Sequence, residues 1–374
     1  MKREKAKDFV ADILAQIDIR IGGDRPWDIQ VHNDELYSRV LAEGSLGLGE
    51  SYMERWWDCE RLDEFFFRVI RNDLKQHIKM GWSTIILMLL EKLTNRQAKG
   101  RRAEEVGRKH YDTGNDLFEA MLDKRMVYSC GYWEGADNLD DAQENKLDLV
   151  CRKLNLEPGM RVLDIGCGWG SFAGFAAEKY GVNVVGINNS KEQVALASKR
   201  YEGLPVEIRF QDYRDVKGTF ERIVSIGMFE HVGPHNYRTF MQVVDNLMID
   251  DGLCLLHTIG TKMPNNKPDA WSDKYIFPGG ILPTVSQMSS AMEGLLMVED
   301  WHNFGNDYVT TLLAWHKNFE DAWPALEEKY GDRLYRMWRY YLLSMAGAFR
   351  SRSNQLWQVV MAKDGLLGGY KSVR

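Results

Sequence analysis

The segment Val162-Leu163-Asp164-Ile165-Gly166-Cys167-Gly168-Trp169-Gly170 carries the strongest structural signal in this chain. Its mainly apolar first half predicts a buried strand, and the three alternating glycines predict a tight turn that leads into a helix. Glycine has no side chain, so the backbone can turn sharply and approach a ligand closely at the amino terminus of that helix. The segment therefore predicts a ligand-binding turn at the end of a strand.

Two features of this turn narrow the range of ligands that it could bind. Glycine-rich turns also occur in dinucleotide-binding enzymes and in purely structural turns. Here Gly166, Gly168 and Gly170 alternate instead of following the GxGxxG spacing, and Asp164 lies on the strand itself. This combination favours S-adenosylmethionine as the ligand.

Further strands follow the glycine turn along the chain. Apolar, β-rich runs alternate with helical patterns, and helices at 171–180 and 191–201 separate the first three strands. The expected strands are 161–165, 183–187, 206–210, 222–226, 253–259, 296–301 and 355–361. This order predicts an α/β fold, a Rossmann-like class I methyltransferase sheet of seven strands with a smaller, mainly helical amino-terminal domain.

The amino-terminal part differs from the rest of the chain in pattern and charge. Residues 1–95 read as mostly helical, with Phe9, Ile13 and Ile17 at helical spacing. Residues 92–109 contain seven Lys and Arg against two Glu, which is typical of a polar linker. We therefore predict an accessory domain over 1–95, a basic linker over 96–109 and a catalytic domain over 110–374.

Composition restricts the class of protein. A formal net charge of -6 argues against a dedicated nucleic-acid binder, and five scattered cysteines without CxxC spacing predict neither disulfides nor a metal site.

The amino terminus has no apolar stretch of signal-peptide length, which predicts a cytoplasmic protein. The longest apolar run, 85–90, is too short to cross a bilayer. With the basic stretch after it, this run suits docking on anionic lipid headgroups, and a core helix with a solvated linker explains it equally well.

Several further segments resemble those of one family. They are His110-Tyr111-Asp112-Thr113-Gly114-Asn115-Asp116, Tyr128-Ser129-Cys130-Gly131-Tyr132-Trp133, Gly227-Met228-Phe229-Glu230-His231-Val232-Gly233 and Leu256-His257-Thr258-Ile259-Gly260. Together with the glycine turn they resemble the cyclopropane-fatty-acyl-phospholipid synthase family. The string from Glu43 to Met53 resembles the extra amino-terminal domain of the full-length bacterial enzymes, so the resemblance covers nearly the whole chain.

The resemblance implies a reaction and a base. In this family a methylene group passes from S-adenosylmethionine to the cis double bond of an acyl chain in a membrane phospholipid, and the carbocation formed loses a proton as a cyclopropane ring closes. The base is bicarbonate, held by groups that match Cys130, Glu230, His257 and Tyr308 and the backbone of Ile259. Convergent donors of this kind are what a buried anion requires.

Each of these residues also has a purely structural interpretation. A lone cysteine such as Cys130 is more often a small buried hydrophobic residue. His257, within an apolar strand, would by itself be a hydrogen-bonded core histidine, and Tyr308 a packed residue with a satisfied hydroxyl. Their joint occurrence in matching contexts favours the functional interpretation.

The resemblance also assigns residues to the cofactor. It places Tyr128 and Ser129 near the methionine end, beside the glycine turn. It places Asn188 and Gln193 near the ribose, and Gln211 with Asp212 near the adenine. The second strand ends in Asn188 instead of the Asp or Glu usual in Rossmann folds, although an amide can also hydrogen-bond ribose hydroxyls. Met345 stands where some family members carry a cysteine.

The acyl chain and the partners are also implied by resemblance. The segment with Trp271, Tyr275 and Phe277 resembles the lining of the acyl tunnel, and a packed apolar loop is the structural alternative. We expect a homodimer at the inner face of the cell membrane, with unsaturated phospholipids as substrate. Alternatives are a methyltransferase that makes methyl-branched lipids or methylates an amine, and a non-catalytic lipid-binding protein.

Overall fold

The computed structural model describes residues 2–72, 114–265 and 267–374. The chain divides into two compact units of three segments each. The first consists of Met1–Met121, Lys267–Gly279 and Leu312–Ser353, and the second of Leu122–Asn266, Gly280–Thr311 and Asn354–Arg374. The apolar run 85–90, the basic linker 96–109 and the first residues of the His110 motif lie outside the described residues, so the predicted domain boundaries stay a prediction.

The second unit is built on a mixed sheet of seven strands in the order β5-β4-β3-β6-β7-β9-β8. The strands are β3 (Arg161–Ile165), β4 (Asn183–Asn188), β5 (Val206–Phe210), β6 (Phe220–Ile226), β7 (Met248–Thr261), β8 (Met297–Asn303) and β9 (Asn354–Ala362). β9 runs antiparallel to both of its neighbours, β7 and β8, and the other strand pairs of this sheet are parallel. All seven predicted strands are present, and the predicted fold class is confirmed.

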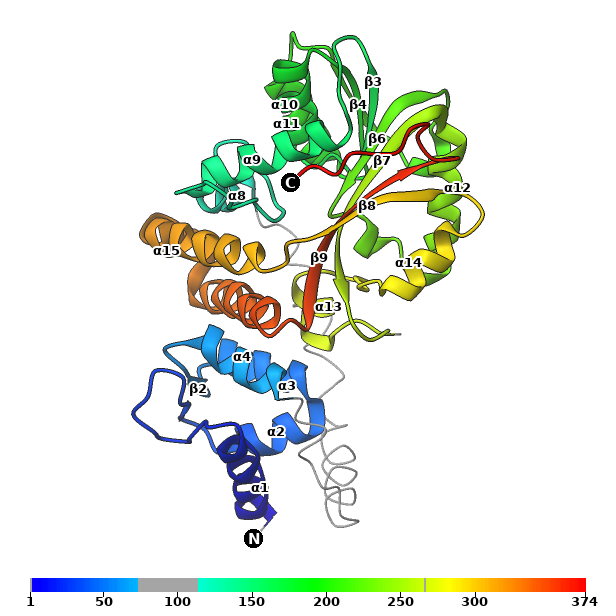
Figure 1. The fold of residues 1–374 in the computed structure, drawn as a ribbon. Coiled ribbons are helices and arrows are strands. Elements are labelled where there is room, and N and C mark those ends of the chain that lie inside the picture. The colour runs from blue at the N-terminus through cyan, green and yellow to red at the C-terminus, as the bar shows by residue number, and fades with distance from the viewer. Residues whose placement is uncertain (1, 73–113, 266) are drawn as a thin grey trace. The chain divides into compact units, whose positions relative to one another are not determined.

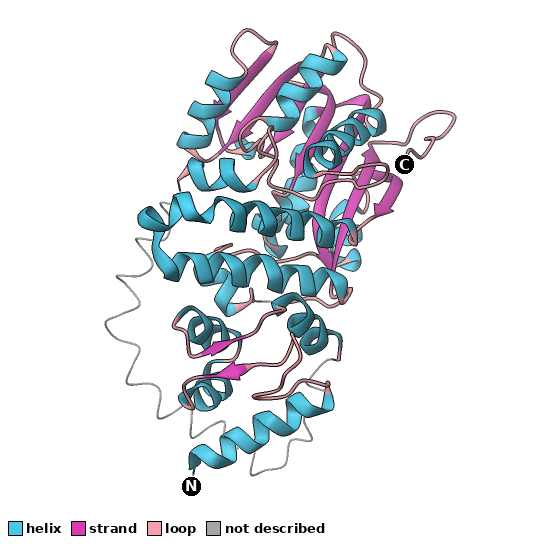
Figure 2. Ribbon diagram, turned by 90° about the vertical axis from the view of Figure 1, so that its left-hand side faces the viewer, coloured by secondary structure: helices cyan, strands magenta, loops and turns pink. Residues whose placement is uncertain are grey.

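Helices cover both faces of this sheet (Figures 1 and 2). The helices of the second unit are α9 (Leu139–Lys153), α10 (Ser171–Tyr180), α11 (Lys191–Arg200), α12 (Tyr237–Leu247) and α14 (Val285–Met292). One core packs α9 and α10 against residues such as Val162, Leu255 and Val360, and the other packs α12 and α14 against Leu163 and Leu256. Because both faces are buried, the central strands are apolar almost without interruption.

The first unit is mainly helical. It contains α1 (Lys2–Gln16), α2 (Glu35–Glu43), α3 (Ser45–Met53), α4 (Leu62–Arg71), α8 (Asn115–Met121), α13 (Ala270–Tyr275), most of α15 (Asp307–Arg350), and the short antiparallel strands β1 (Gln30–Val31) and β2 (Trp57–Asp58). Its core is aromatic: the ring of Tyr52 lies 5.1 Å from that of Trp57 and 5.6 Å from that of Tyr340. Complete burial of one large apolar side chain stabilises the folded protein by about 1.5–3 kcal/mol. Gly331, with φ 70°, kinks α15.

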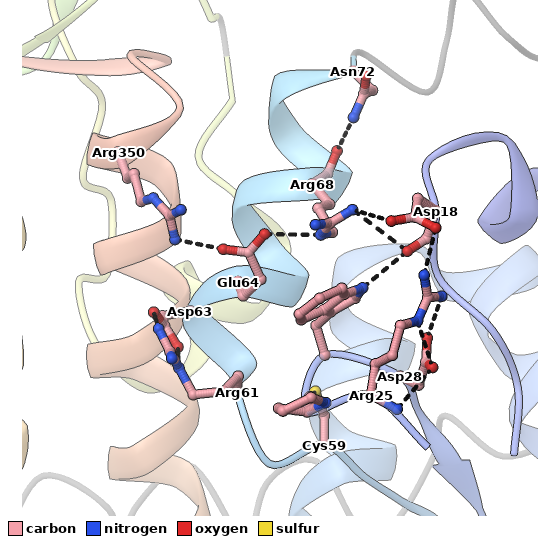
Figure 3. A network of polar contacts seen from close by, with 12 residues as sticks. Asp18, Arg25, Asp28, Cys59, Arg61, Asp63, Glu64, Arg68, Asn72 and Arg350 are labelled. Carbon is pink, nitrogen blue, oxygen red and sulfur yellow. Dashed lines mark hydrogen bonds and ion pairs between the residues drawn. The ribbon is translucent and has the colours of Figure 1, made fainter. Parts of the chain in front are cut away.

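Charged groups of the first unit tie its segments together (Figure 3). Glu64 on α4 accepts hydrogen bonds from Arg68 at 2.8 Å and from Arg350 on α15 at 2.6 Å. Arg68 also donates to Asp18 at 2.8 Å, and Arg25 contacts the same carboxylate. The network thus joins α4, α15 and the loop after α1.

Candidate active site

The glycine turn follows β3 directly in the second unit. The amides of Gly166 and Cys167 both donate to the carbonyl of Ile187 on β4, each at 3.0 Å. Gly166 has a φ of 85°, and a Cβ atom there would lie 2.7 Å from the side chain of Met228. Only glycine fits this position. Gly170, with φ 78°, is the residue before α10, so the turn delivers the amino terminus of a helix to the end of the strand.

Buried polar groups lie beside this turn. Asp164 on β3 is 2% exposed, and its Oδ2 has no hydrogen-bond partner within the described part of the chain. Lys146 on α9 is fully buried and donates to the hydroxyl of Ser129 at 2.9 Å. Burial raises the pKa of Asp164, and the nearby Lys146 ammonium opposes that rise. Burial lowers the pKa of Lys146, against the attraction of Asp123, Cys130 and Asp164.

The segment that precedes α9 is held by the same helix. Gln143, three residues before Lys146, donates through its amide to the carbonyl of Ser129 at 2.7 Å. Tyr128 lies next to it in the chain and is partly exposed. The structure therefore brings the predicted residues Ser129 and Asp164 together around one ammonium group.

The end of β4 supports the turn from the other side. The side-chain nitrogen of Asn188, Nδ2, donates to the backbone carbonyl of Gly168 at 3.2 Å and to Oε1 of Gln193 at 2.7 Å. Its oxygen accepts from the amide of Ser190 at 3.1 Å. Asn188 thus holds both the glycine turn and the side chain of Gln193. Its contact with Oε1 of Gln193 also fixes the direction of the Gln193 side-chain nitrogen.

The predicted adenine residues follow β5, the strand next to β4. The amide of Gln211 donates to the carbonyl of Asn188 at 3.2 Å. Asp212 accepts from the amide of Arg214 at 2.9 Å and forms an ion pair with its guanidinium at 2.7 Å. The hydrogen bond from Arg214 lowers the pKa of Asp212. Since β5, β4 and β3 are neighbours, the predicted cofactor residues gather at one edge of the sheet.

Glu230 lies in a short 3-10 helix, Phe229–His231, directly after β6. Its Oε1 accepts a hydrogen bond of 2.6 Å from the backbone amide of Ile259 on β7. Its Oε2 is buried and has no partner among the residues that the structure describes. Burial raises the pKa of Glu230 to about 7, and the Ile259 amide opposes that rise. The Ile259 amide, with the Thr258 side chain, stabilises the charged form of this buried carboxylate.

His257 lies two residues before Ile259 on β7 and is 1% exposed. Its Nδ1 lies 3.3 Å from the amide nitrogen of Gln358 on β9, and its Nε2 lacks a partner in the described ranges. Burial, together with the positive charges of Lys146 and Lys153, holds the pKa of His257 well below its usual range. The imidazole is neutral at ordinary pH.

Cys130 and Tyr308 are both buried. The hydroxyl of Thr311, in the first turn of α15, accepts from the amide of Gly131 at 3.1 Å and lies 3.8 Å from the Cys130 sulfur. Tyr308 belongs to the same turn. Burial raises the pKa of the Cys130 thiol well above its usual range, which argues for a neutral thiol and against a nucleophile.

The predicted substrate residues belong to the first unit. Trp271 is 2% exposed and its ring lies 4.5 Å from that of Tyr340. The hydroxyl of Tyr275 donates to Glu50 at 2.7 Å, and the ring of Phe277 lies 5.7 Å from that of Tyr341. Their role in binding an acyl chain stays a prediction.

The prediction from sequence missed several buried polar residues of the second unit. These are Gln143, Lys146 and Lys153 on α9, and Gln358 on β9. The signal was present in the pattern, because each interrupts an apolar face at helical or strand spacing. In the described residues no group of three or more His, Cys, Asp or Glu side chains could hold a metal ion.

Comparison with known proteins bears on this geometry. Residues 98–359 match the family model described as mycolic acid cyclopropane synthetase. The chain belongs to this family. It is 51% identical over 363 residues to the cyclopropane-fatty-acyl-phospholipid synthase of Escherichia coli strain K12, an alignment that covers 97% of this chain and 94% of the relative.

Solved structures of family members have the same fold. The cyclopropane synthase MmaA2 from Mycobacterium tuberculosis superposes with a TM-score of 0.64 at 30% identity, covering 70% of this chain and 98% of that one. The mycolic acid cyclopropane synthase CmaA1, solved in complex with SAH and CTAB, gives a TM-score of 0.64 at 31% identity, covering 68% of this chain and 96% of that one. The family, the fold class and the enzyme class predicted from the sequence, an S-adenosylmethionine-dependent transferase, are confirmed.

Proposed function

We propose that the protein transfers a methylene group from S-adenosylmethionine to the cis double bond of an unsaturated acyl chain in a membrane phospholipid, forming a cyclopropane ring. Membership of the family and the similarity to the Escherichia coli synthase along almost the whole chain support this activity. No catalytic nucleophile is needed, since the alkene supplies the electrons that attack the sulfonium methyl.

One observation carries the proposal for the base. Glu230 Oε2 and His257 Nε2 are buried, and both lack partners within the described chain, although buried polar atoms are almost always hydrogen-bonded. Glu230 is hydrogen-bonded to the backbone of Ile259 on β7, and His257 lies two residues earlier on the same strand. A small oxyanion with a hydroxyl fits this pair, because it can accept from the imidazole and donate to the carboxylate. Bicarbonate would supply the base that removes a proton from the carbocation, and Cys130 and Tyr308 would complete its surroundings.

The cofactor residues have separate tasks. S-adenosylmethionine supplies the electrophilic methyl group when it is bound. The glycine turn leaves room for it, and Asp164 with Ser129 would hold its methionine end while Lys146 balances the buried charge. Gln193, oriented by Asn188, would meet the ribose, and Gln211 with Asp212 the adenine.

We further propose that the protein works as a homodimer, peripherally bound to the inner face of the cell membrane. Nowhere in the described residues is a helix both long and apolar enough to cross a bilayer. Light scattering of the purified protein tests the dimer.

Mass spectrometry of phospholipid acyl chains tests the reaction. Purified protein, S-adenosylmethionine and bicarbonate are incubated with vesicles of unsaturated phospholipid, and we expect a gain of one CH2 with the double bond replaced by a ring. A gain with the double bond retained indicates a methyl-branched or methylene product. An unchanged lipid, with cofactor bound, indicates a different acceptor such as an amine.

Two variants test the base site within the same assay. Glu230→Gln and His257→Ala are expected to abolish most turnover and to leave S-adenosylmethionine binding nearly intact, because neither side chain belongs to the cofactor set. Rates like those of the unaltered protein in both variants would contradict the assignment of the base.

A further inference from the structure

Gln358 stands between two histidines in the sheet. In the register of β9 it lies opposite His257 on β7 and opposite His302 on β8. Residues directly opposite on neighbouring strands point to the same face, here the face covered by α9 and α10. Gln358 is completely buried there, although it follows Leu356 and Trp357 in an apolar strand. A buried glutamine at this place needs partners, and the imidazole of His257 is one.

The contact between Gln358 and His257 determines which ring nitrogen carries the proton. The amide nitrogen of Gln358 lies 3.3 Å from Nδ1 of His257, and an amide nitrogen can only donate. A neutral imidazole that accepts at Nδ1 carries its proton on Nε2. The ring stays neutral because it is buried and faces Lys146 and Lys153 of α9, so the tautomer decides whether Nε2 is a donor or an acceptor.

His302 provides an internal parallel. Its Nδ1 lies 3.0 Å from the Nζ atom of Lys153, which donates to this nitrogen when it is an ammonium. Burial and the charge of Lys153 lower the pKa of His302 to about 4, so this ring is neutral too. Both histidines beside Gln358 thus present Nδ1 to a side-chain nitrogen that can donate a hydrogen bond.

We propose that Gln358 is a positioning residue that holds neutral His257 in the Nε2–H tautomer, so that the ring donates a hydrogen bond to the anion bound beside Glu230. This inference rests on the proposed base site. With the opposite tautomer, Nε2 would aim a lone pair at the anion and repel it. No other described side chain is hydrogen-bonded to the ring of His257.

Nitrogen NMR of the side chains tests the tautomer without substrate, cofactor or turnover. The protein has eight histidines, so the signal of His257 is identified by its loss in His257→Asn. We expect Nε2 to be protonated and Nδ1 bare. In Gln358→Glu the carboxylate can only accept, so the proton should move to Nδ1. A bare Nε2 in the unaltered protein would overturn the inference, as would an unchanged tautomer in Gln358→Glu.

Kinetics connect the tautomer to the anion. In Gln358→Glu the KM for bicarbonate should rise roughly ten- to hundredfold, the value of one hydrogen bond to a charged group. Gln355→Glu is the matched control, because Gln355 lies on the same strand but opposite Gly260. The KM of this variant for bicarbonate should equal that of the unaltered protein. Gln358→Met, which removes the donor without adding charge, should also raise KM, and a thermal unfolding scan checks that each variant is folded.

The two proposals fail in different ways. If turnover of the unaltered protein does not depend on bicarbonate, the proposed base is wrong, whereas the NMR result reports on Gln358 alone. If the tautomer switches in Gln358→Glu and KM for bicarbonate stays the same, the inference about Gln358 is overturned.

Discussion

Lys146 lies at the centre of the polar groups in the second unit. It hydrogen-bonds Ser129 and acts electrostatically on Asp164, Cys130 and His257, so the proposed cofactor residues and the proposed base residues share one buried cation. Burial of a charge is costly, and it is tolerated where the charge is paired and hydrogen-bonded. This arrangement indicates that Lys146 serves the site more than the stability of the fold.

Replacement of Lys146 tests this role. In Lys146→Met, Ser129 loses its charged donor and the pKa of Asp164 is no longer held down, so both groups become poorer ligands. We expect S-adenosylhomocysteine to bind roughly tenfold more weakly or worse, measured by calorimetry. Lys153→Met is the matched control, since Lys153 is buried on the same helix but contacts His302 and Asp300. Equal weakening in both variants would contradict a specific role of Lys146.

Lys153 itself should make stability depend on pH. Burial lowers its pKa to about 7, while in the unfolded chain it titrates near 10.5. Above about pH 7 the unfolded chain binds more protons, so the free energy of unfolding rises with pH, by about 2 kcal/mol up to about pH 9. Urea unfolding of the unaltered protein and of Lys153→Met should therefore diverge over this window. A constant difference between the two would show that Lys153 does not change its pKa on folding.

At the level of elements, the sequence predicts the sheet well. The predicted strands 161–165 and 206–210 coincide with β3 and β5, and the predicted helix 171–180 coincides with α10. The strand predicted over 253–259 is longer in the structure, because β7 begins at Met248 with residues whose polar character hides the strand. A long apolar run between two glycine turns identifies a strand without ambiguity, whereas the residues at which the strand begins and ends cannot be read from the pattern.

The prediction was weaker where a polar residue is buried or an element is very short. Gln143 and Lys146 are residue types that usually face solvent, although α9 turns both inward, and only their spacing among apolar residues indicates this burial. The two-residue strands β1 and β2 carry no periodic signal at all. The candidate site at Glu230 is therefore predicted by resemblance, whereas buried polar residues such as Gln143 are recognised only in the structure.

The loop between α1 and β1 offers a test at the same scale. Asp28 has a fully buried side chain and accepts from the backbone amide of Arg20 at 2.7 Å and from the guanidinium of Arg25 at 2.8 Å. Asp28→Asn leaves these donors poorly paired and should cost about 1–3 kcal/mol in urea unfolding. Asp18→Asn is the control, because its carboxylate is 61% exposed and exposed ion pairs contribute little. If Asp18→Asn is the more damaging change, the loop is held by its surface ion pairs.

At the scale of the whole molecule, charge is unevenly distributed along the chain. The formal net charge is -6, yet residues 92–109 hold seven basic and two acidic side chains. An acidic protein is repelled on average by an anionic membrane, so the proposed membrane contact would need a local cluster of positive charge. Each Lys or Arg near such a surface contributes about 1 kcal/mol, and salt screens the attraction.

Vesicle binding tests this distribution of charge. Arg101→Gln with Arg102→Gln removes two positive charges from the basic stretch, and binding to anionic vesicles should weaken roughly tenfold or more at moderate salt. Lys199→Gln with Lys217→Gln makes the same change of net charge at exposed positions of the second unit. Cosedimentation should show weaker binding for the first pair only, and the difference should vanish in high salt. Equal losses for both pairs would mean that net charge, and not the basic stretch, governs the contact with the membrane.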